Sequence, residues 1–131
     1  ATKKESGREN RMNKLIGILE KEDCDVEDAL TRCMNMEELY LELLELFVED
    51  DQIDQLMDAF RQKDAAAVFF HSHTLKGVYT NLGMKRLYEL DVPVVEGTRE
   101  KRQESLAGLE EDVDALCREH KRIVAVIREC I

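Results

Sequence analysis

The sequence predicts an all-α fold, an antiparallel four-helix bundle with short extra N-terminal helices. Its 131 residues include only one proline and six glycines, which leaves few positions for the turns that a sheet of short strands needs. Hydrophobic residues make up 44% of the chain and charged residues 37%, a balance typical of a folded, helix-rich domain. Apolar residues recur at three- and four-residue spacing in four long stretches, and a bundle buries four such stripes.

The N-terminal part is expected to contain a tail and two short helices. Residues 1–12 are polar and aperiodic, so we expect a tail or a linker remnant there, followed by a single domain over 13–131. Within this domain, 15–23 and 26–34 are expected to form short helices. Asp25 is expected to cap the second one, because its side-chain oxygen can accept from the free N–H groups of the first turn.

The first and last long helices are predicted from their apolar stripes. The first is expected over 36–64, with a bend near Asp50 and Asp51, and the last over 105–131. Both stripes have the spacing of a helix that packs along a bundle. The first stripe consists of Leu39, Leu43, Phe47, Ile53, Met57 and Phe60, and the second of Leu106, Leu109, Val113, Leu116, Ile123 and Ile127.

The two central helices are predicted from their ends. Residues 65–82 lie between Asp64, a good N-cap, and Gly83, a good C-terminal stop. The next helix is expected over 84–100. Pro93 is expected to kink or split it, because proline lacks an N–H group and clashes with the preceding turn.

Charge and cysteine content exclude several classes of function. The net charge of −10 and a pI near 4.8 argue against nucleic acid or an anionic membrane as a partner. The charged start lacks the apolar region of a secretory signal, and no apolar run has the length of a membrane span. The four cysteines show no zinc-finger spacing, and because no export signal is present we expect free thiols in a reducing cytoplasm.

Metal-dependent and nucleotide-dependent activities are also not expected. Di-metal bundles use Glu-x-x-His pairs, and no glutamate lies three residues before any of the three histidines. The chain has no glycine-rich phosphate loop and is too short for a nucleotide-binding domain beside the bundle, which argues against a kinase. No metal or other cofactor is therefore expected.

The stretch HSHTLKG at residues 71–77 places two histidines on different faces of one predicted helix. At about 100° per residue, His71 lies among the apolar residues and His73 lies opposite them. We therefore expect His71 to be a buried or boundary residue that is satisfied by a hydrogen bond, and His73 to face solvent. His120, between two apolar residues of the last helix, is expected to be a packing residue. The apolar residues opposite His73 are Val68, Leu75, Val78 and Leu82.

The surroundings of His73 point to phosphoryl chemistry. Phe69 and Phe70 give the face an apolar rim, which a monomer has little reason to expose. Gly77 lies one turn beyond His73, where any Cβ is expected to crowd the imidazole, and Lys76 brings an ammonium group that suits a phosphate. These features describe a phosphorylatable histidine that docks against another protein. The remaining candidates for the docking face are Ala66, Thr80, Lys85 and Arg86.

HTLKG, within residues 65–87, resembles the signature of the histidine-containing phosphotransfer (HPt) domain. In that family a histidine is followed by lysine and glycine at the third and fourth positions and later by an aliphatic–glycine pair. Here these are His73, Lys76, Gly77 and Leu82–Gly83. The resemblance covers about residues 24–130 and includes Tyr40, Leu44 and Phe47 in the N-terminal helices. The chain departs from the family pattern at Pro93, in a helix that is usually unbroken, and at Ser72, where alanine is frequent.

The resemblance implies a carrier in a multistep phosphorelay rather than an enzyme. His73 would accept a phosphoryl group from an aspartate of a response-regulator receiver domain and pass it to another receiver, with Lys76 holding the phosphoryl oxygens and Gly77 giving access. Mg²⁺ is expected on the receiver. The chain is expected to be a monomer, and we favour its being a domain of a hybrid sensor histidine kinase over a stand-alone protein. An unphosphorylated receiver-binding adaptor, a dimerising kinase bundle and His71 as the acceptor are the alternatives.

Overall fold

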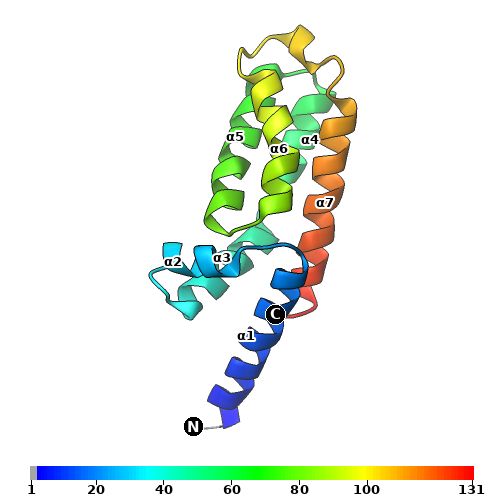
Figure 1. The fold of residues 1–131 in the computed structure, drawn as a ribbon. Helices are drawn as coiled ribbons and strands as arrows, with labels where there is room; N and C mark the ends of the chain where they lie inside the picture. The colour runs from blue at the N-terminus through cyan, green and yellow to red at the C-terminus, as the bar shows by residue number, and fades with distance from the viewer. Residues whose placement is uncertain (1–2) are drawn as a thin grey trace.

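The structure is a computed structural model, and it describes residues 3–131 (Figure 1). This part of the chain is helical and contains no β-strand, so the predicted fold class is confirmed. Cys24 and Met84 form an isolated antiparallel bridge where two connections meet. Among the described helices, none is long and apolar enough to cross a membrane. The helices are α1 (Lys3–Lys21), α2 (Val26–Arg32), α3 (Glu37–Glu49), α4 (Gln52–Arg61), α5 (Ala65–Asn81), α6 (Lys85–Thr98) and α7 (Glu110–Arg128), with a 3₁₀ helix, η1 (Gln103–Leu106), before α7.

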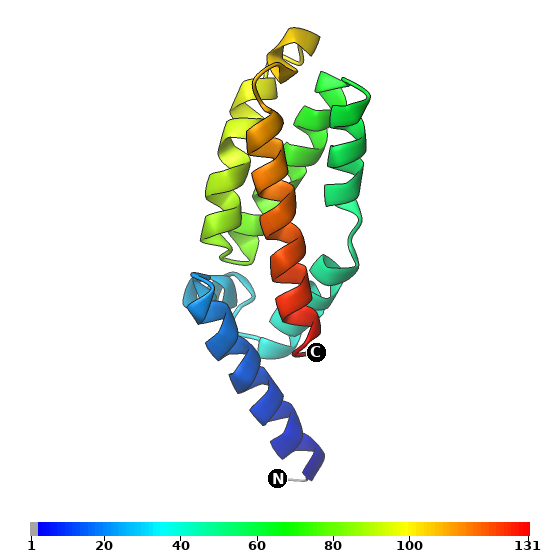
Figure 2. The same ribbon diagram turned by 90° about the vertical axis from the view of Figure 1, so that its right-hand side faces the viewer.

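Helices α4, α5, α6 and α7 form the antiparallel four-helix bundle (Figures 1 and 2). Helix α5 packs against α4 on one side and most extensively against α6 on the other, and α6 in turn packs against α7. Helices α2 and α3 lie at the end of the bundle where α5 ends and α6 begins. The core is continuous from α1 to α7.

Helix α1 is longer than the sequence predicts. It begins at Lys3, inside the segment 1–12 that is expected to be a tail, and it runs to Lys21 without interruption. Met12, Leu15 and Leu19 are buried, which ties the second half of the helix to the domain. In both ribbon views α1 extends beyond the end of the bundle (Figures 1 and 2). Residues 1–2, also part of the expected tail, lie outside the described residues.

The predicted helix over 36–64 is two helices, because the chain breaks at Asp50 and Asp51 instead of bending there. Asp50 has an extended backbone (φ −72°, ψ 133°), and its side chain accepts a hydrogen bond of 3.1 Å from the Gln52 N–H group. Such a local bond competes with the helical ladder. The buried face is also offset from the predicted stripe in both helices, so that Leu39, Leu43, Met57 and Phe60 are half-buried. The fully buried residues are Tyr40, Leu44, Phe47, Val48, Ile53, Leu56 and Ala59.

Pro93 is expected to kink or split this helix, and the split is wrong, because α6 continues through Pro93. Pro93 is exposed, as is Glu89, whose carbonyl group would otherwise accept the missing N–H bond. Water can satisfy that carbonyl group, which makes proline tolerable at this position. The face of α6 that meets α5 and α7 is therefore unbroken from Leu87 to Thr98.

The predicted caps are confirmed, and they fix the ends of α2 and α5. Asp25 accepts from the Asp28 N–H group at 3.0 Å, and Asp64 accepts from the Ala67 N–H group at 3.1 Å. Gly83 follows α5 with φ +66°, the left-handed conformation that commonly ends a helix.

His120 is an interhelical packing residue, as predicted. It is buried on α7, and its Nδ1 atom lies 2.7 Å from the hydroxyl group of Tyr79 on α5. Its ring also contacts the ring of Phe47, with 4.7 Å between the centroids. Burial lowers the pKa of His120 to about 4, so the imidazole is neutral in the folded protein at pH 7.

Gly83→Ala is expected to destabilise the fold by at least about 2 kcal/mol, because a left-handed alanine is strained and its Cβ has no room. A Cβ at Gly83 would meet the Asp25 backbone, with 2.9 Å to the carbonyl carbon, and Asp25 N–H donates to the Gly83 carbonyl at 2.7 Å. Urea unfolding measures the loss. Gly108→Ala is the matched control, because Gly108 also has positive φ (+87°) but open space around it. Equal losses of unfolding free energy in the two variants would show that the close approach of the Asp25 backbone adds no cost.

Candidate functional site

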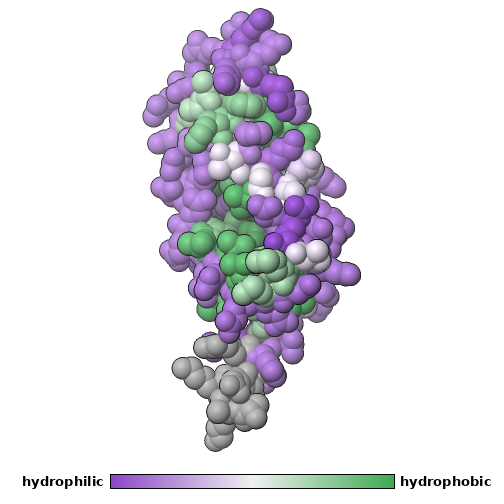
Figure 3. Space-filling view, turned by 90° about the vertical axis from the view of Figure 1, so that its left-hand side faces the viewer, coloured by the Kyte–Doolittle hydropathy of each residue, from purple (hydrophilic) through white to green (hydrophobic). Residues whose placement is uncertain are grey.

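Helix α5 presents His73 to solvent. Val68, Leu75 and Tyr79 are buried on the inner face of the helix, and His73 is exposed on the other face. The predicted orientation of His73 is therefore confirmed. Among the described residues the His73 imidazole has no hydrogen-bond partner, so neither ring nitrogen is occupied by the protein. Figure 3 views the side of the molecule on which α5 lies in Figure 1, where apolar patches alternate with hydrophilic side chains.

The ring of Phe69 orients the ring of His73. The two rings are stacked, with 5.4 Å between their centroids and 16° between their planes. Phe69 is itself half-buried, and two cations lie over its ring: the Arg99 guanidinium carbon at 5.8 Å and the Lys101 amino nitrogen at 5.4 Å from the centroid. Cations at this distance from an aromatic face are attracted to it. Two cations therefore border the ring that stacks on His73, in a chain whose net charge is −10, and one of them, Arg99, is also paired with Glu96 at 2.7 Å.

Lys76 lies in the seam between α5 and α6. Its side chain is half-buried, and its amino nitrogen lies 5.8 Å from the centroid of the Tyr88 ring. It is close enough to Glu96 to contribute to the lowered pKa of that carboxyl group, of which the hydrogen bond from Arg99 is the main cause. Among the described residues Lys76 has no salt bridge, so its ammonium group is available to an incoming anion.

Gly77 is exposed, and its surroundings correct one expectation. A Cβ at Gly77 would have no neighbouring atom within 4 Å, so an alanine there would not crowd the His73 ring. Side chains one turn apart on a helix are about 5–6 Å apart at Cβ, which explains the open space. The space beside His73 is thus free for a phosphoryl group or a partner, and the free imidazole does not require a glycine at this position.

The other predicted docking residues are spread over more than one face. Ala66 and Phe70 are exposed on α5, with 63% of Phe70 accessible. Thr80 uses its hydroxyl group to donate to the Lys76 carbonyl at 2.8 Å. Lys85 is exposed on the first turn of α6, whereas the Arg86 guanidinium is drawn toward α7, 3.4 Å from the carboxylate of Glu119.

His71 is the boundary residue that the sequence predicts. It is half-buried, and its Nδ1 atom lies 2.6 Å from the side-chain amide nitrogen of Gln52 on α4. Phe70 packs edge-on against its ring, with 5.3 Å between the centroids. Because one nitrogen is occupied and the ring is partly covered, His71 is less accessible to a partner than His73.

Sequence reasoning missed the residues that α6 and its C-terminal turn bring to the site. Tyr88 contacts Lys76, and Arg99 and Lys101 contact Phe69. Tyr88 and Arg99 are eleven residues apart, which is close to three turns of a helix, so their common face could have been found from their spacing. That this face meets α5 at Phe69 and Lys76 follows only from the packing of the bundle.

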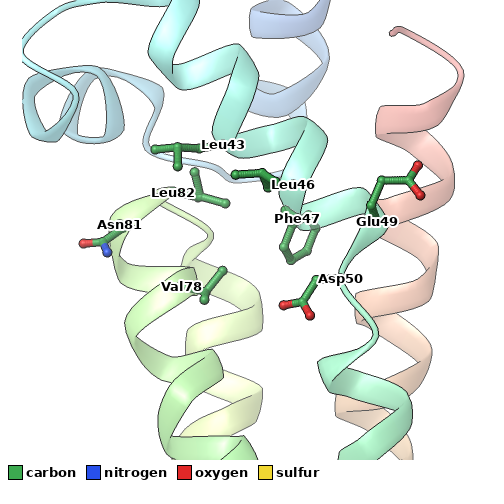
Figure 4. Close-up of a pocket in the computed structure, with 8 residues that line it drawn as sticks. All are labelled: Leu43, Leu46, Phe47, Glu49, Asp50, Val78, Asn81 and Leu82. Carbon is green, nitrogen blue, oxygen red and sulfur yellow. The ribbon is translucent and has the colours of Figure 1, made fainter.

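A groove lies beyond the C-terminal end of the His73 face, between α3 and α5 (Figure 4). It has a volume of about 430 Å³ and is lined mainly by apolar side chains, with two carboxylates, Glu49 and Asp50, at one side. Two acidic groups and the absence of a lining cation make it unsuited to phosphate. The described residues contain no cluster of three side chains that could hold a metal ion. The apolar lining residues are Leu43, Leu46, Phe47, Val78 and Leu82.

Comparison with protein families decides the assignment. A model of the Hpt domain family matches residues 42–119, more than half of the chain, and the match contains His73 and both α5 and α6. The chain belongs to the Hpt domain family. Hpt domains are phosphocarrier modules of phosphorelays that interact with receiver domains, so this chain is a phosphotransfer module. Comparisons with curated proteins and with solved structures give no match.

Proposed function

We propose that His73 of this Hpt domain accepts a phosphoryl group from the aspartyl phosphate of a receiver domain and passes it to the aspartate of another receiver. The observation that carries the proposal is that the His73 imidazole is exposed and unpaired, with Lys76 three residues away on the same helix. His71 lacks both features, because its ring is partly covered and bonded to Gln52.

The transfer needs a neutral imidazole nitrogen, and a histidine is largely unprotonated at neutral pH. The lone pair of Nε2 attacks phosphorus in line with the aspartate oxygen. A P–N bond forms while the P–O bond breaks, and the bonding electrons leave with the aspartate as its carboxylate. The stacked Phe69 ring limits the orientations of His73, which favours this in-line approach.

Charge neutralisation on this domain comes from the cations around His73. Phosphoryl transfer is mainly a matter of positioning and of stabilising charge on the phosphoryl oxygens. Lys76 faces the site from α5 and Lys101 borders it at Phe69, whereas Arg99, also at Phe69, is already paired with Glu96. Mg²⁺ is assigned to the receiver, whose own groups would hold it, and no cofactor or nucleotide site is assigned to this chain.

Phosphoryl uptake tests the proposal directly. A receiver is charged with a small phosphodonor and mixed with this protein, and intact mass is recorded with time. We expect a gain of one phosphoryl group that is lost in acid, as a phosphohistidine is. Binding to several receivers without any gain in mass would favour the hypothesis of an unphosphorylated adaptor. A stable dimer on a sizing column would favour the hypothesis of a dimerising kinase bundle.

Gly77→Ala is expected to separate stability from function. Alanine in a helix is about 1 kcal/mol more favourable than glycine, and there is room for its Cβ, so the free energy of unfolding should rise. Uptake should slow by roughly tenfold, because the methyl group occupies the open space beside His73. Urea unfolding and transfer kinetics on the same sample measure both effects. Unchanged kinetics would show that a glycine is not needed for access.

A further inference from the structure

Asp91 is a buried acid for which the fold offers no partner. It lies on α6 with an exposed fraction of 0%, and neither carboxylate oxygen has a hydrogen-bond partner among the described residues. A buried, unpaired carboxylate is costly, so the group is held protonated unless a cation approaches. Burial accordingly raises the pKa of Asp91 to about 8.

Lys76, on the facing helix α5, meets α6 about one turn before Asp91, because its amino nitrogen lies 5.8 Å from the centroid of the Tyr88 ring. It is also the charged group that acts on Asp91. Its ammonium group opposes the effect of burial and lowers the pKa of Asp91. Tyr79, also on α5, is close enough to Asp91 for the carboxylate to raise the pKa of the phenol, although burial is the larger cause. The Tyr79 hydroxyl group is paired with His120 on α7, so it is not a partner for Asp91. Asp91 thus lies in the same seam as Lys76, behind the His73 face.

We propose that Asp91 is a positioning residue for Lys76. As a neutral acid, Asp91 leaves the Lys76 ammonium group free to bind the phosphoryl group on His73, and as a carboxylate it draws the ammonium group back into the seam between α5 and α6. The proposal rests on the proposed function of His73. It follows from the placement of one buried acid behind the half-buried lysine of the site.

The expected consequence is a phosphotransfer rate that depends on the protonation of Asp91. An ionised Asp91 on the facing helix would compete with the phosphoryl oxygens for the one positive charge of Lys76. Transfer should therefore be fastest while Asp91 is protonated and should slow as pH rises through the range in which it ionises. A residue with a merely structural role would change the rate equally at every pH.

Kinetics of the matched variants test this consequence. Transfer from the same charged receiver is measured between pH 6 and pH 9.5 for wild type, Asp91→Asn, Lys76→Gln and the double variant. The ratio of variant to wild type at each pH cancels the titration of the receiver. We expect Asp91→Asn to match wild type at pH 6 and to exceed it by roughly fivefold at pH 9.5, the equivalent of about 1 kcal/mol of charge interaction.

In the Lys76→Gln background the Asp91 substitution should have no pH-dependent effect, because the lysine through which it acts is absent. A constant ratio of Asp91→Asn to wild type across the pH range would overturn the proposal. The same pH-dependent ratio in the presence and absence of Lys76 would also overturn it.

A second measurement does not depend on phosphoryl uptake. The carboxyl carbon of Asp91 is followed by NMR as a function of pH in wild type, Lys76→Gln and Lys63→Gln, in which an exposed lysine outside the seam is replaced. We expect the Asp91 titration to move up by roughly one pH unit in Lys76→Gln and to stay unchanged in Lys63→Gln. An unchanged titration in Lys76→Gln would overturn the coupling even if His73 is phosphorylated. A shifted titration in a protein that takes up no phosphoryl group would support the coupling and overturn the proposed function.

Discussion

Replacing His73 with glutamine is expected to abolish phosphoryl uptake from a charged receiver. Glutamine is similar in length and polarity, but its amide nitrogen is not nucleophilic, so no P–N bond can form. Because His73 is exposed and has no hydrogen bond or ion pair among the described residues, the substitution should leave the fold intact. Intact mass after incubation with the charged receiver measures uptake, and far-ultraviolet circular dichroism checks the helical content.

His71→Gln is the matched control on the same helix. The His71 ring is half-buried and bonded to Gln52, so the variant should lose some stability, by about 1 kcal/mol, and keep its uptake. Uptake that persists in His73→Gln and disappears in His71→Gln would mean that the exposed face of α5 is not the phosphoryl-accepting face. Loss in both variants with normal circular dichroism would point to a shared role of the two histidines.

The exposed side of the site could be predicted from the sequence because it depends on one helix. Asp64 and Gly83 fix the ends of α5, and the apolar residues of this segment fix which face turns inward. His73 and His71 follow from that phase alone. The short-range signals within one helix were thus enough to locate His73 and Lys76.

The part of the site that comes from α6 could not be predicted in the same way. Which residues of α6 face α5 depends on how two helices pack, and Pro93 made the course of α6 itself ambiguous. The break at Asp50 shows the same limit, since a local hydrogen bond to the Gln52 N–H group decides between a bend and two helices. The burial of Asp91 is a further case, because an acid in an amphipathic helix is normally assigned to the solvent face.

Asp91 and His120 are expected to shape the dependence of stability on pH in opposite directions. The pKa of Asp91 is raised from 3.8 to about 8 by burial, so its contribution to stability is fully present below pH 3.8 and is lost as pH rises to about 8. The pKa of His120 is lowered from 6.5 to about 4, also by burial, so its contribution is present above pH 6.5 and is lost as pH falls toward 4.

Between pH 4 and pH 6.5 the two effects oppose each other, because unfolding releases the proton of Asp91 and takes up a proton on His120. Between pH 6.5 and pH 8 the Asp91 effect dominates, because the buried thiols and phenols whose pKa burial also raises ionise in the unfolded chain only near pH 9 and above. The free energy of unfolding should then fall by about 1.4 kcal/mol per pH unit, which amounts to about 2 kcal/mol between pH 6.5 and pH 8. Groups whose pKa is lowered, such as Glu22, are ionised in both states over this range and contribute no slope.

Asp91→Asn should remove this alkaline slope, because the amide is neutral at every pH and resembles the protonated acid in size. Urea unfolding at pH 6.5, 7.25, 8 and 9 gives the free energy of unfolding of wild type and variant. We expect the two to diverge steadily up to pH 8 and to run parallel above it, with the variant the more stable protein. Parallel curves from pH 6.5 upward would show that Asp91 is already ionised in the folded protein at neutral pH, so that Lys76 is paired before any phosphoryl group arrives.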